Sequence, residues 1–182
     1  MIDILKRLPK SQSILQVYAV IAVMLSGWTI TAFLWKLSTW LLTLNIGEIF
    51  TVFSYAMITN LVESLIVLLL LLTVCVLLPP RILRDDFAVR GALLSMGIIG
   101  SLMAFVRLNM RSGMESTARV LVEPFAVLLL TAFLLFFSSK NRFALFVRSA
   151  VLWISDRMVV FLFILLPLFV ILSVYVIFRN IA

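Results

Sequence analysis

The chain has 182 residues, of which 64% are hydrophobic and 13% charged, with a formal net charge of +7 and no histidine. A water-soluble fold of this size needs fewer apolar residues to fill one core, so the surplus must face lipid. The missing histidine excludes His-ligated haem, His-based zinc sites, Ser-His triads and imidazole proton shuttles within this chain. The Lys and Arg residues are scattered at span ends without a compact basic motif, so we expect no nucleic-acid partner.

The apolar segments predict membrane-spanning helices. Unsatisfied backbone groups are costly in hydrocarbon, so spans must be helices or closed barrels, and the apolar run Leu65 to Leu78 lacks the alternation of a barrel strand. Cys75 lies within this run, and we interpret it as a small core residue. We therefore predict an all-α, polytopic bundle over 1–182 as one domain, with four to five transmembrane helices and one or two interfacial amphipathic helices.

The first predicted span covers about 14–35 and follows a short basic N-terminal stretch. Its hydrophobic run is longer than the core of a typical signal peptide, and no small-residue cleavage site follows it, so we expect an uncleaved span. The mixed segment 37–50 is predicted to lie among the headgroups, where Trp35 and Trp40 suit a membrane interface.

The second predicted span covers about 51–78 and stops at Pro79 and Pro80, where a helix cannot continue. The third, about 91–106, is short and rich in Gly, Ala and Ser, which lets helix backbones approach closely. We expect a short, closely packed span there, and the alternative is a re-entrant segment.

The fourth predicted span covers about 113–137. Ser112 and Glu115 match a capping box at its start, and Pro124 lies inside it.

The C-terminal region is predicted to contain two helices. Apolar residues recur at helical spacing over 143–157, with polar residues largely opposite, which favours a helix lying on the membrane surface. The last span then covers about 158–178, with Pro167 inside it.

Orientation follows from the basic residues on each side of five spans. Ten Lys and Arg residues fall on the N-terminal side and five on the other. The positive-inside rule then predicts a cytoplasmic N-terminus and an outside C-terminus. A re-entrant third span would change this count and place the C-terminus inside. Because no organelle transit pattern precedes the first span, the cytoplasmic membrane is the expected location.

Glu63 is the most interesting single residue, because it lies inside the second predicted span. A charge at membrane depth costs about 2.5 kcal/mol or more, so such a carboxylate suggests a function. Asn60 and Thr59 lie three and four residues earlier, on the same helical face. The group is interpreted either as a proton or cation site, or as a structural contact in which Glu63 lies near the interface.

A second candidate group lies in the fourth predicted span. Glu115, Arg119 and Glu123 are spaced four apart, and Pro124 leaves one backbone carbonyl without its helical amide. The group is interpreted as an ion or polar-ligand site, or as a kink that bends the helix. Arg107 and Arg111 are candidate headgroup or anion contacts, or solvated anchors.

Three classes of function remain. The leading hypothesis is a non-catalytic membrane subunit or scaffold, which binds other membrane proteins, or itself, through small-residue helix faces and the 143–157 helix on the cytoplasmic side. The second is a small ion- or proton-coupled transporter or channel subunit that uses Glu63 or Glu123. The third is a lipid-modifying enzyme, which is disfavoured because no nucleophile, metal set or phosphate loop is visible. We predict no cofactor and no metal, and the expected partners are the lipid bilayer and other membrane subunits.

Overall fold

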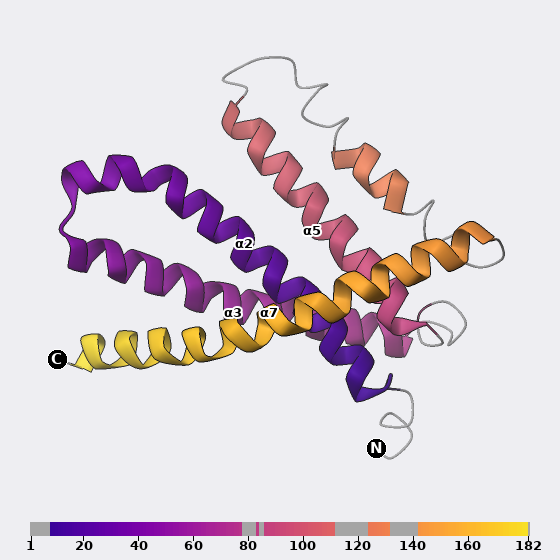
Figure 1. Ribbon diagram of the computed structural model, residues 1–182. Coiled ribbons are helices and arrows are strands. Elements are labelled where there is room, and N and C mark those ends of the chain that lie inside the picture. Colours follow the sequence, from indigo (N-terminus) through magenta and orange to yellow (C-terminus); the bar gives the residue numbers. More distant parts are fainter. Residues whose placement is uncertain (1–7, 78–82, 84–85, 112–123, 132–141, 182) are drawn as a thin grey trace.

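The computed structural model describes residues 8–77, 83, 86–111, 124–131 and 142–181, with side chains described except at 108–111 and 142–144. These residues form the long helices α2 (Ser11–Thr43), α3 (Ile46–Leu77), α5 (Phe87–Arg111) and α7 (Arg142–Ile181), and a short helix over 124–131 (Figure 1). No strand occurs in the described ranges, so the predicted all-α class is confirmed.

The four long helices are each apolar and long enough to cross a membrane. They contain 33, 32, 25 and 40 residues, whereas a ~30 Å hydrocarbon layer needs only ~20. Large apolar side chains cover their outer faces: Leu69, Ile164 and Phe178 are 62%, 63% and 70% exposed. Lipid must cover these faces, and the chain is therefore a multi-pass helical membrane protein.

The first two helices extend further than predicted. The segment 37–50 is almost entirely helical, and only Leu44 and Asn45 separate α2 from α3. The start of α3 is fixed by a reciprocal cap, because the Asn45 amide donates to a carboxylate oxygen of Glu48 at 2.9 Å and the Glu48 amide donates to the Asn45 carbonyl at 2.9 Å. A tight helical hairpin thus occupies the segment predicted to lie among the headgroups, and the depth of this hairpin stays a prediction.

The predicted length of the third span is wrong. The small-residue stretch 91–106 lies inside α5, which has 25 residues. The helix begins at Phe87 and continues through Arg107, because the flanking residues include no Pro or Gly that would end it. A helix of this length crosses the hydrocarbon layer completely, which removes the structural reason for a re-entrant segment.

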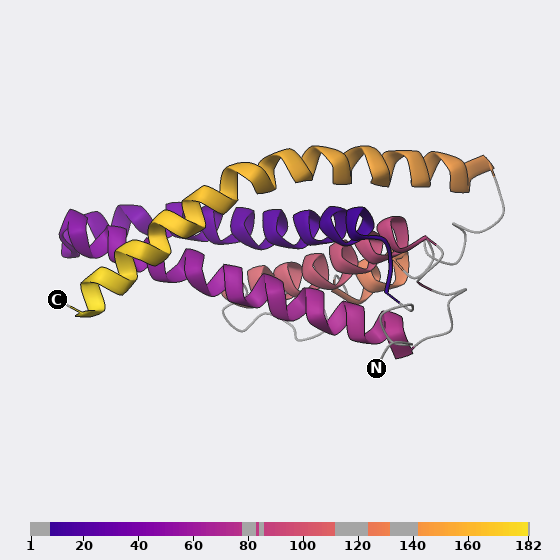
Figure 2. The same cartoon turned by 90° about the horizontal axis from the view of Figure 1, so that it is seen from below.

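The predicted break between a surface helix 143–157 and a last span 158–178 is also wrong. A single helix, α7, covers both segments and extends from Arg142 to Ile181. Pro167 lies inside it, and Figure 2 shows α7 bending along its course rather than ending. At 1.5 Å per residue α7 is roughly 60 Å long, so one part of it extends beyond the hydrocarbon layer.

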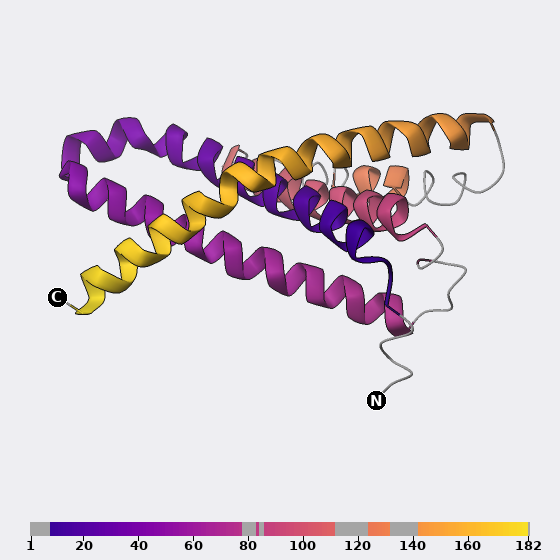
Figure 3. The same ribbon diagram turned by 60° about the horizontal axis from the view of Figure 1, so that its bottom comes forward.

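The central helix of the bundle is α2, which packs against α3, α5 and α7. Figure 1 shows α3 running antiparallel to α2, while α5 and α7 start at the same end of the bundle as α2. Figures 2 and 3 show α7 lying across the α2–α3 hairpin, and it contacts both helices. Close packing against α2 is possible because Ala19, Ala22 and Ser26 are small and buried.

The described part of the fourth predicted span is the short helix 124–131; the rest of 113–137 lies outside the described residues. This helix packs on α5, where Val127 and Thr131 are the side chains nearest to Gly100 and Gly97. The end of α5 and the start of α7 lie toward opposite ends of the bundle (Figure 1).

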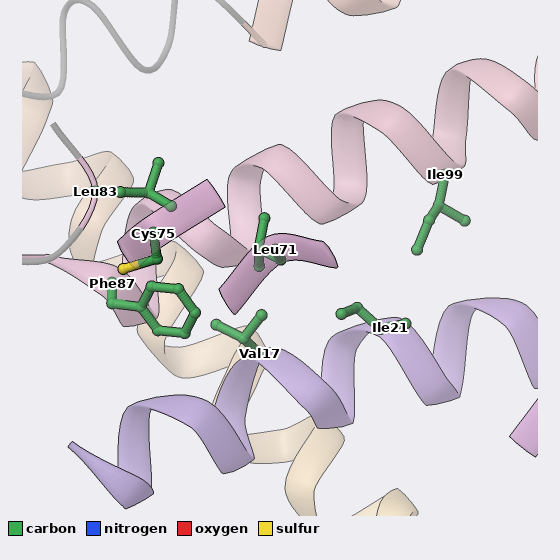
Figure 4. Close-up of a cluster of buried hydrophobic side chains, with 7 residues drawn as sticks. All are labelled: Val17, Ile21, Leu71, Cys75, Leu83, Phe87 and Ile99. Carbon is green, nitrogen blue, oxygen red and sulfur yellow. The ribbon is translucent and has the colours of Figure 1, made fainter. Parts of the chain in front are cut away.

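The best-packed region joins α2, α3 and α5 near the start of α2. Val17, Leu71, Cys75 and Phe87 belong to one buried cluster, in which side chains of the three helices converge (Figure 4). A Cβ added at Gly91 would lie 3.1 Å from Val17 and 3.5 Å from Leu71, so the backbone of α5 approaches its neighbours closely there. The prediction that Cys75 is a core residue is confirmed.

Candidate functional site

Two sets of polar side chains mark the two ends of the bundle. At one end, which we call the first polar layer, Gln16 donates to Asp156 at 2.7 Å and Arg148 pairs with Asp86 at 2.9 Å. Both interactions tie α7 to another part of the chain. Charged and hydrogen-bonded groups of this kind belong at the membrane–water boundary.

The opposite end carries the second polar layer. Its members are Lys36, Tyr55, Arg107, Tyr175 and Asn180. Tyr55 donates to Asn180 at 2.8 Å, and the Tyr175 hydroxyl lies 3.1 Å from that of Thr51. From Gln16 to Lys36 the helix rises roughly 30 Å, which equals the thickness of the hydrocarbon core. The two layers are therefore spaced as the two faces of a bilayer.

Glu63 lies midway between these layers. It follows Tyr55, in the second layer, by about eight residues, and precedes Leu71 by about eight, which is roughly 12 Å of helix on each side. Leu71 packs beside Val17, next to Gln16 of the first layer. Both interpretations of Glu63, a proton or cation site and a structural contact near the interface, stay predictions.

The side chain of Glu63 is exposed and lies on an apolar face of α3. Ile66 and Leu70, one and two turns further along this face, are 50% and 61% exposed. The ion pair found within the described ranges joins Arg148 to Asp86, so Glu63 has no cationic partner among these residues. A carboxylate thus faces outward from the bundle among apolar side chains, midway between the two polar layers.

Asn60, one turn before Glu63, points into the protein instead. It is 5% exposed, and its side-chain oxygen accepts a hydrogen bond from the Thr29 hydroxyl at 3.0 Å. Its Nδ2 atom has no partner among the described residues. Thr59 is exposed, and its hydroxyl donates to the carbonyl of Tyr55 in the same helix at 2.9 Å. Asn60 therefore fixes α3 to α2, while Glu63, like Thr59, faces outward.

Of the other predicted site residues, only Arg107 has a described side chain. Arg107 is exposed at the second polar layer, where it borders a groove that also contains Lys36. Arg111 ends α5, and its side chain lies outside the described residues, as do Arg119 and Glu123. The candidate group of Glu115, Arg119 and Glu123 therefore remains a prediction. Among the described residues no three His, Cys, Asp or Glu side chains group as metal ligands.

The small residues of α5 serve packing within the chain. Gly91, Ala92, Ser95 and Gly97 are buried, and a Cβ at Gly97 would come within 2.7 Å of the Thr131 Cβ. This face is therefore already occupied by α2 and the helix 124–131.

Sequence reasoning missed the pairing at the first polar layer. Asp86 was visible as part of a polar connection and Arg148 as part of the predicted surface helix. Nothing in their spacing indicates that the two meet, because the contact joins segments about sixty residues apart.

Comparison with known proteins does not assign the chain to a family. No family model matches the chain, and neither the curated proteins nor the solved structures gave a match. The function is therefore inferred from the site.

Proposed function

We propose that this chain is a non-catalytic subunit of the cytoplasmic membrane that binds a second transmembrane helix over the Glu63 face of α3. The observation that carries the proposal is the exposed carboxylate midway between the polar layers. Facing lipid it would cost about 2.5–3.5 kcal/mol. A partner that supplies a Lys, an Arg or a hydrogen-bond donor removes that cost.

The partner is a different subunit rather than a symmetric second copy. A two-fold contact through this face would place two Glu63 carboxylates against each other at low dielectric, where like charges repel strongly. A helix with a basic residue near its middle is complementary instead. The apolar surroundings of Glu63, including Ile66 and Leu70, supply the remaining contact area.

The orientation proposed for the subunit places its N-terminus in the cytoplasm and its C-terminus outside. The supporting observations are the excess of Lys and Arg on the N-terminal side and the opposite positions of the start of α2 and the end of α7 (Figure 1). Cysteine-accessibility labelling of residues added at each terminus tests this arrangement.

The test combines purification with site-directed crosslinking. The tagged chain is extracted from its native membrane in mild detergent, and co-purifying proteins are identified by mass spectrometry. We expect a stoichiometric partner with the wild type, at least a tenfold loss with Glu63→Leu, and a smaller loss with Glu63→Gln, which keeps a hydrogen-bonding amide. A photo-crosslinker at Ile66 should capture the same partner, whereas one at Phe163, which is exposed on α7, should not.

Glu48→Gln is the matched control, because Glu48 lies at the hairpin and glutamine retains the oxygen that accepts from Asn45. This variant should keep the partner. Recovery of the lone chain from the wild-type membrane, or an unchanged partner yield with Glu63→Leu, would reject the proposal.

The second candidate function is proton- or cation-coupled transport. It is favoured by the same carboxylate together with the buried Asn60 amide one turn away. In this case Glu63→Gln in reconstituted vesicles abolishes flux, and Glu123→Gln tests the second predicted carboxylate. Wild-type flux no greater than that of empty vesicles rejects this candidate.

A further inference from the structure

The helices separate toward the second polar layer and leave a groove there. In Figure 1, α5 diverges from the α2–α3 hairpin along its length. The groove has a volume of about 570 Å³ and is lined by side chains of all three helices, among them Trp28, Trp35, Lys36, Val52 and Arg107. This volume is within the ~300–1,000 Å³ of typical small-ligand sites.

The groove is amphipathic along its length. Its wall is mainly apolar and aromatic, with Trp28 and Phe33 from α2 and Val52 from α3. Lys36 of α2 and Arg107 of α5 also line the groove, and neither forms an ion pair with a described residue. Two cationic side chains beside an apolar groove are complementary to a lipid, because its anionic headgroup can pair with the cations while an acyl chain lies along the apolar wall.

We propose that this groove binds an anionic phospholipid of the adjacent leaflet. The lipid phosphate lies between Lys36 and Arg107, and one acyl chain follows the wall formed by Trp28 and Val52. The tryptophans suit this position, since the indole ring combines an apolar body with one hydrogen-bond donor at headgroup depth. The bound chain fills the space between α5 and the hairpin that the side chains of the described residues leave open. This site is independent of the partner contact at Glu63.

The experiment uses tryptophan fluorescence in the full-length chain. The sequence has four tryptophans, three of which, Trp28, Trp35 and Trp40, line the groove. Trp153→Phe removes the fourth, which is exposed on α7, from all samples. The protein is reconstituted in phosphatidylcholine vesicles that contain a minor fraction of lipid brominated on its acyl chains, either phosphatidylglycerol or phosphatidylcholine. Bromine quenches a tryptophan only at contact, so the ratio of quenching gives the relative affinity for the two lipids.

We expect the brominated anionic lipid to be preferred by roughly tenfold over the zwitterionic one. The double variant Lys36→Gln/Arg107→Gln should bring this preference close to one. Lys36→Arg/Arg107→Lys keeps both charges and should retain it. The control Lys10→Gln/Arg179→Gln removes the same net charge outside the groove and should also retain it.

Three outcomes overturn the proposal. These are a wild type with no preference for the anionic lipid, an unchanged preference in the Lys36→Gln/Arg107→Gln variant, and an equal loss in the Lys10→Gln/Arg179→Gln control. Circular dichroism of each variant in the same vesicles separates loss of the site from loss of the fold.

Discussion

The two ends of the bundle are held together by different means. At the first polar layer, α7 is fixed to α2 by Gln16 and Asp156 and to the start of α5 by Arg148 and Asp86. At the second, α5 separates from the hairpin, and Lys36 and Arg107 have no ionic partner among the described residues. The difference concerns α5, because at the second end α7 is still tied to α3 by the hydrogen bonds of Tyr55 with Asn180 and of Thr51 with Tyr175.

Packing of α5 against the α2–α3 hairpin follows the same gradient, whereas α3 and α7 stay closely packed near the second layer through Met57, Phe169 and Leu172. Val17 and Phe87, which are 0% and 2% exposed, lie in the cluster beside the first layer. Trp35, near the second layer, is 70% exposed. In a bilayer the lipid tails are as apolar as leucine, so closeness of packing rather than hydrophobicity stabilises one helix against another. The exposed Trp35 side chain therefore contributes little to stability, whereas Phe33 and Phe50 at the same end pack edge-to-face against Phe53 and Tyr175.

Among the variants proposed here, Phe87→Ala should lower the free energy of unfolding most, because it acts at the closely packed first end. It opens a cavity where α2, α3 and α5 converge, and we expect a loss of roughly 3 kcal/mol in the free energy of unfolding. Phe163→Ala, at a lipid-facing residue that is 62% exposed, should change it by less than about 0.5 kcal/mol. The measurement is unfolding by a denaturing detergent in mixed micelles, with thiol labelling of the buried Cys75 as the reporter. Equal effects of the two variants would show that the cluster is not a distinct core.

Gly97→Ala should have an intermediate effect and shows where along α5 the close packing ends. The added methyl group collides with Thr131, so helix 124–131 must shift, and we expect a loss of about 1–3 kcal/mol. At Gly100 the nearest atom, on Val127, would be 3.9 Å away, which is an ordinary contact. Gly100→Ala should therefore be neutral or stabilising by about 0.5 kcal/mol, because alanine favours a helix. The same unfolding measurement applies, and a neutral Gly97→Ala would contradict the close approach.

The sequence was sufficient for the helical membrane class, the number of long apolar segments and the burial of Cys75, because these depend on composition and length. The sequence was insufficient to predict which side chains of each helix face lipid and which face the rest of the protein. Along α3 the protein-facing side chains include the polar residues Thr51, Ser54, Asn60 and Ser64, so hydrophobicity does not mark the buried face, and the hydrophobic pattern does not distinguish the outward Glu63 from the inward Asn60. The cap formed by Asn45 and Glu48 was visible as a motif and would have predicted the start of a helix within the segment 37–50.

The extent of α7 shows a different limit. Amphipathic spacing over 143–157 correctly identifies a helix, but periodicity alone cannot say whether that helix ends before the apolar run that follows. The polar residues Asp156 and Arg157 favoured a boundary between the helix 143–157 and the last span. In the structure Asp156 accepts from Gln16 and Arg157 lies 5.5 Å from the Trp153 ring centre, so both are accommodated within a continuous helix.

The smallest expected effect belongs to the ion pair of the first layer. Arg148 and Asp86 are 52% and 34% exposed, and a pair so accessible to solvent contributes about 0.2–1 kcal/mol, less at high salt. A double-mutant cycle with Arg148→Gln and Asp86→Asn should give a coupling energy in this range that decreases as salt is raised. The interaction of Gln16 with Asp156 involves only one charge, so its coupling should depend less on salt. If the Arg148–Asp86 coupling is zero, these charges only mark the membrane boundary, and the first end is held by the packing of Val17 and Phe87 against α3.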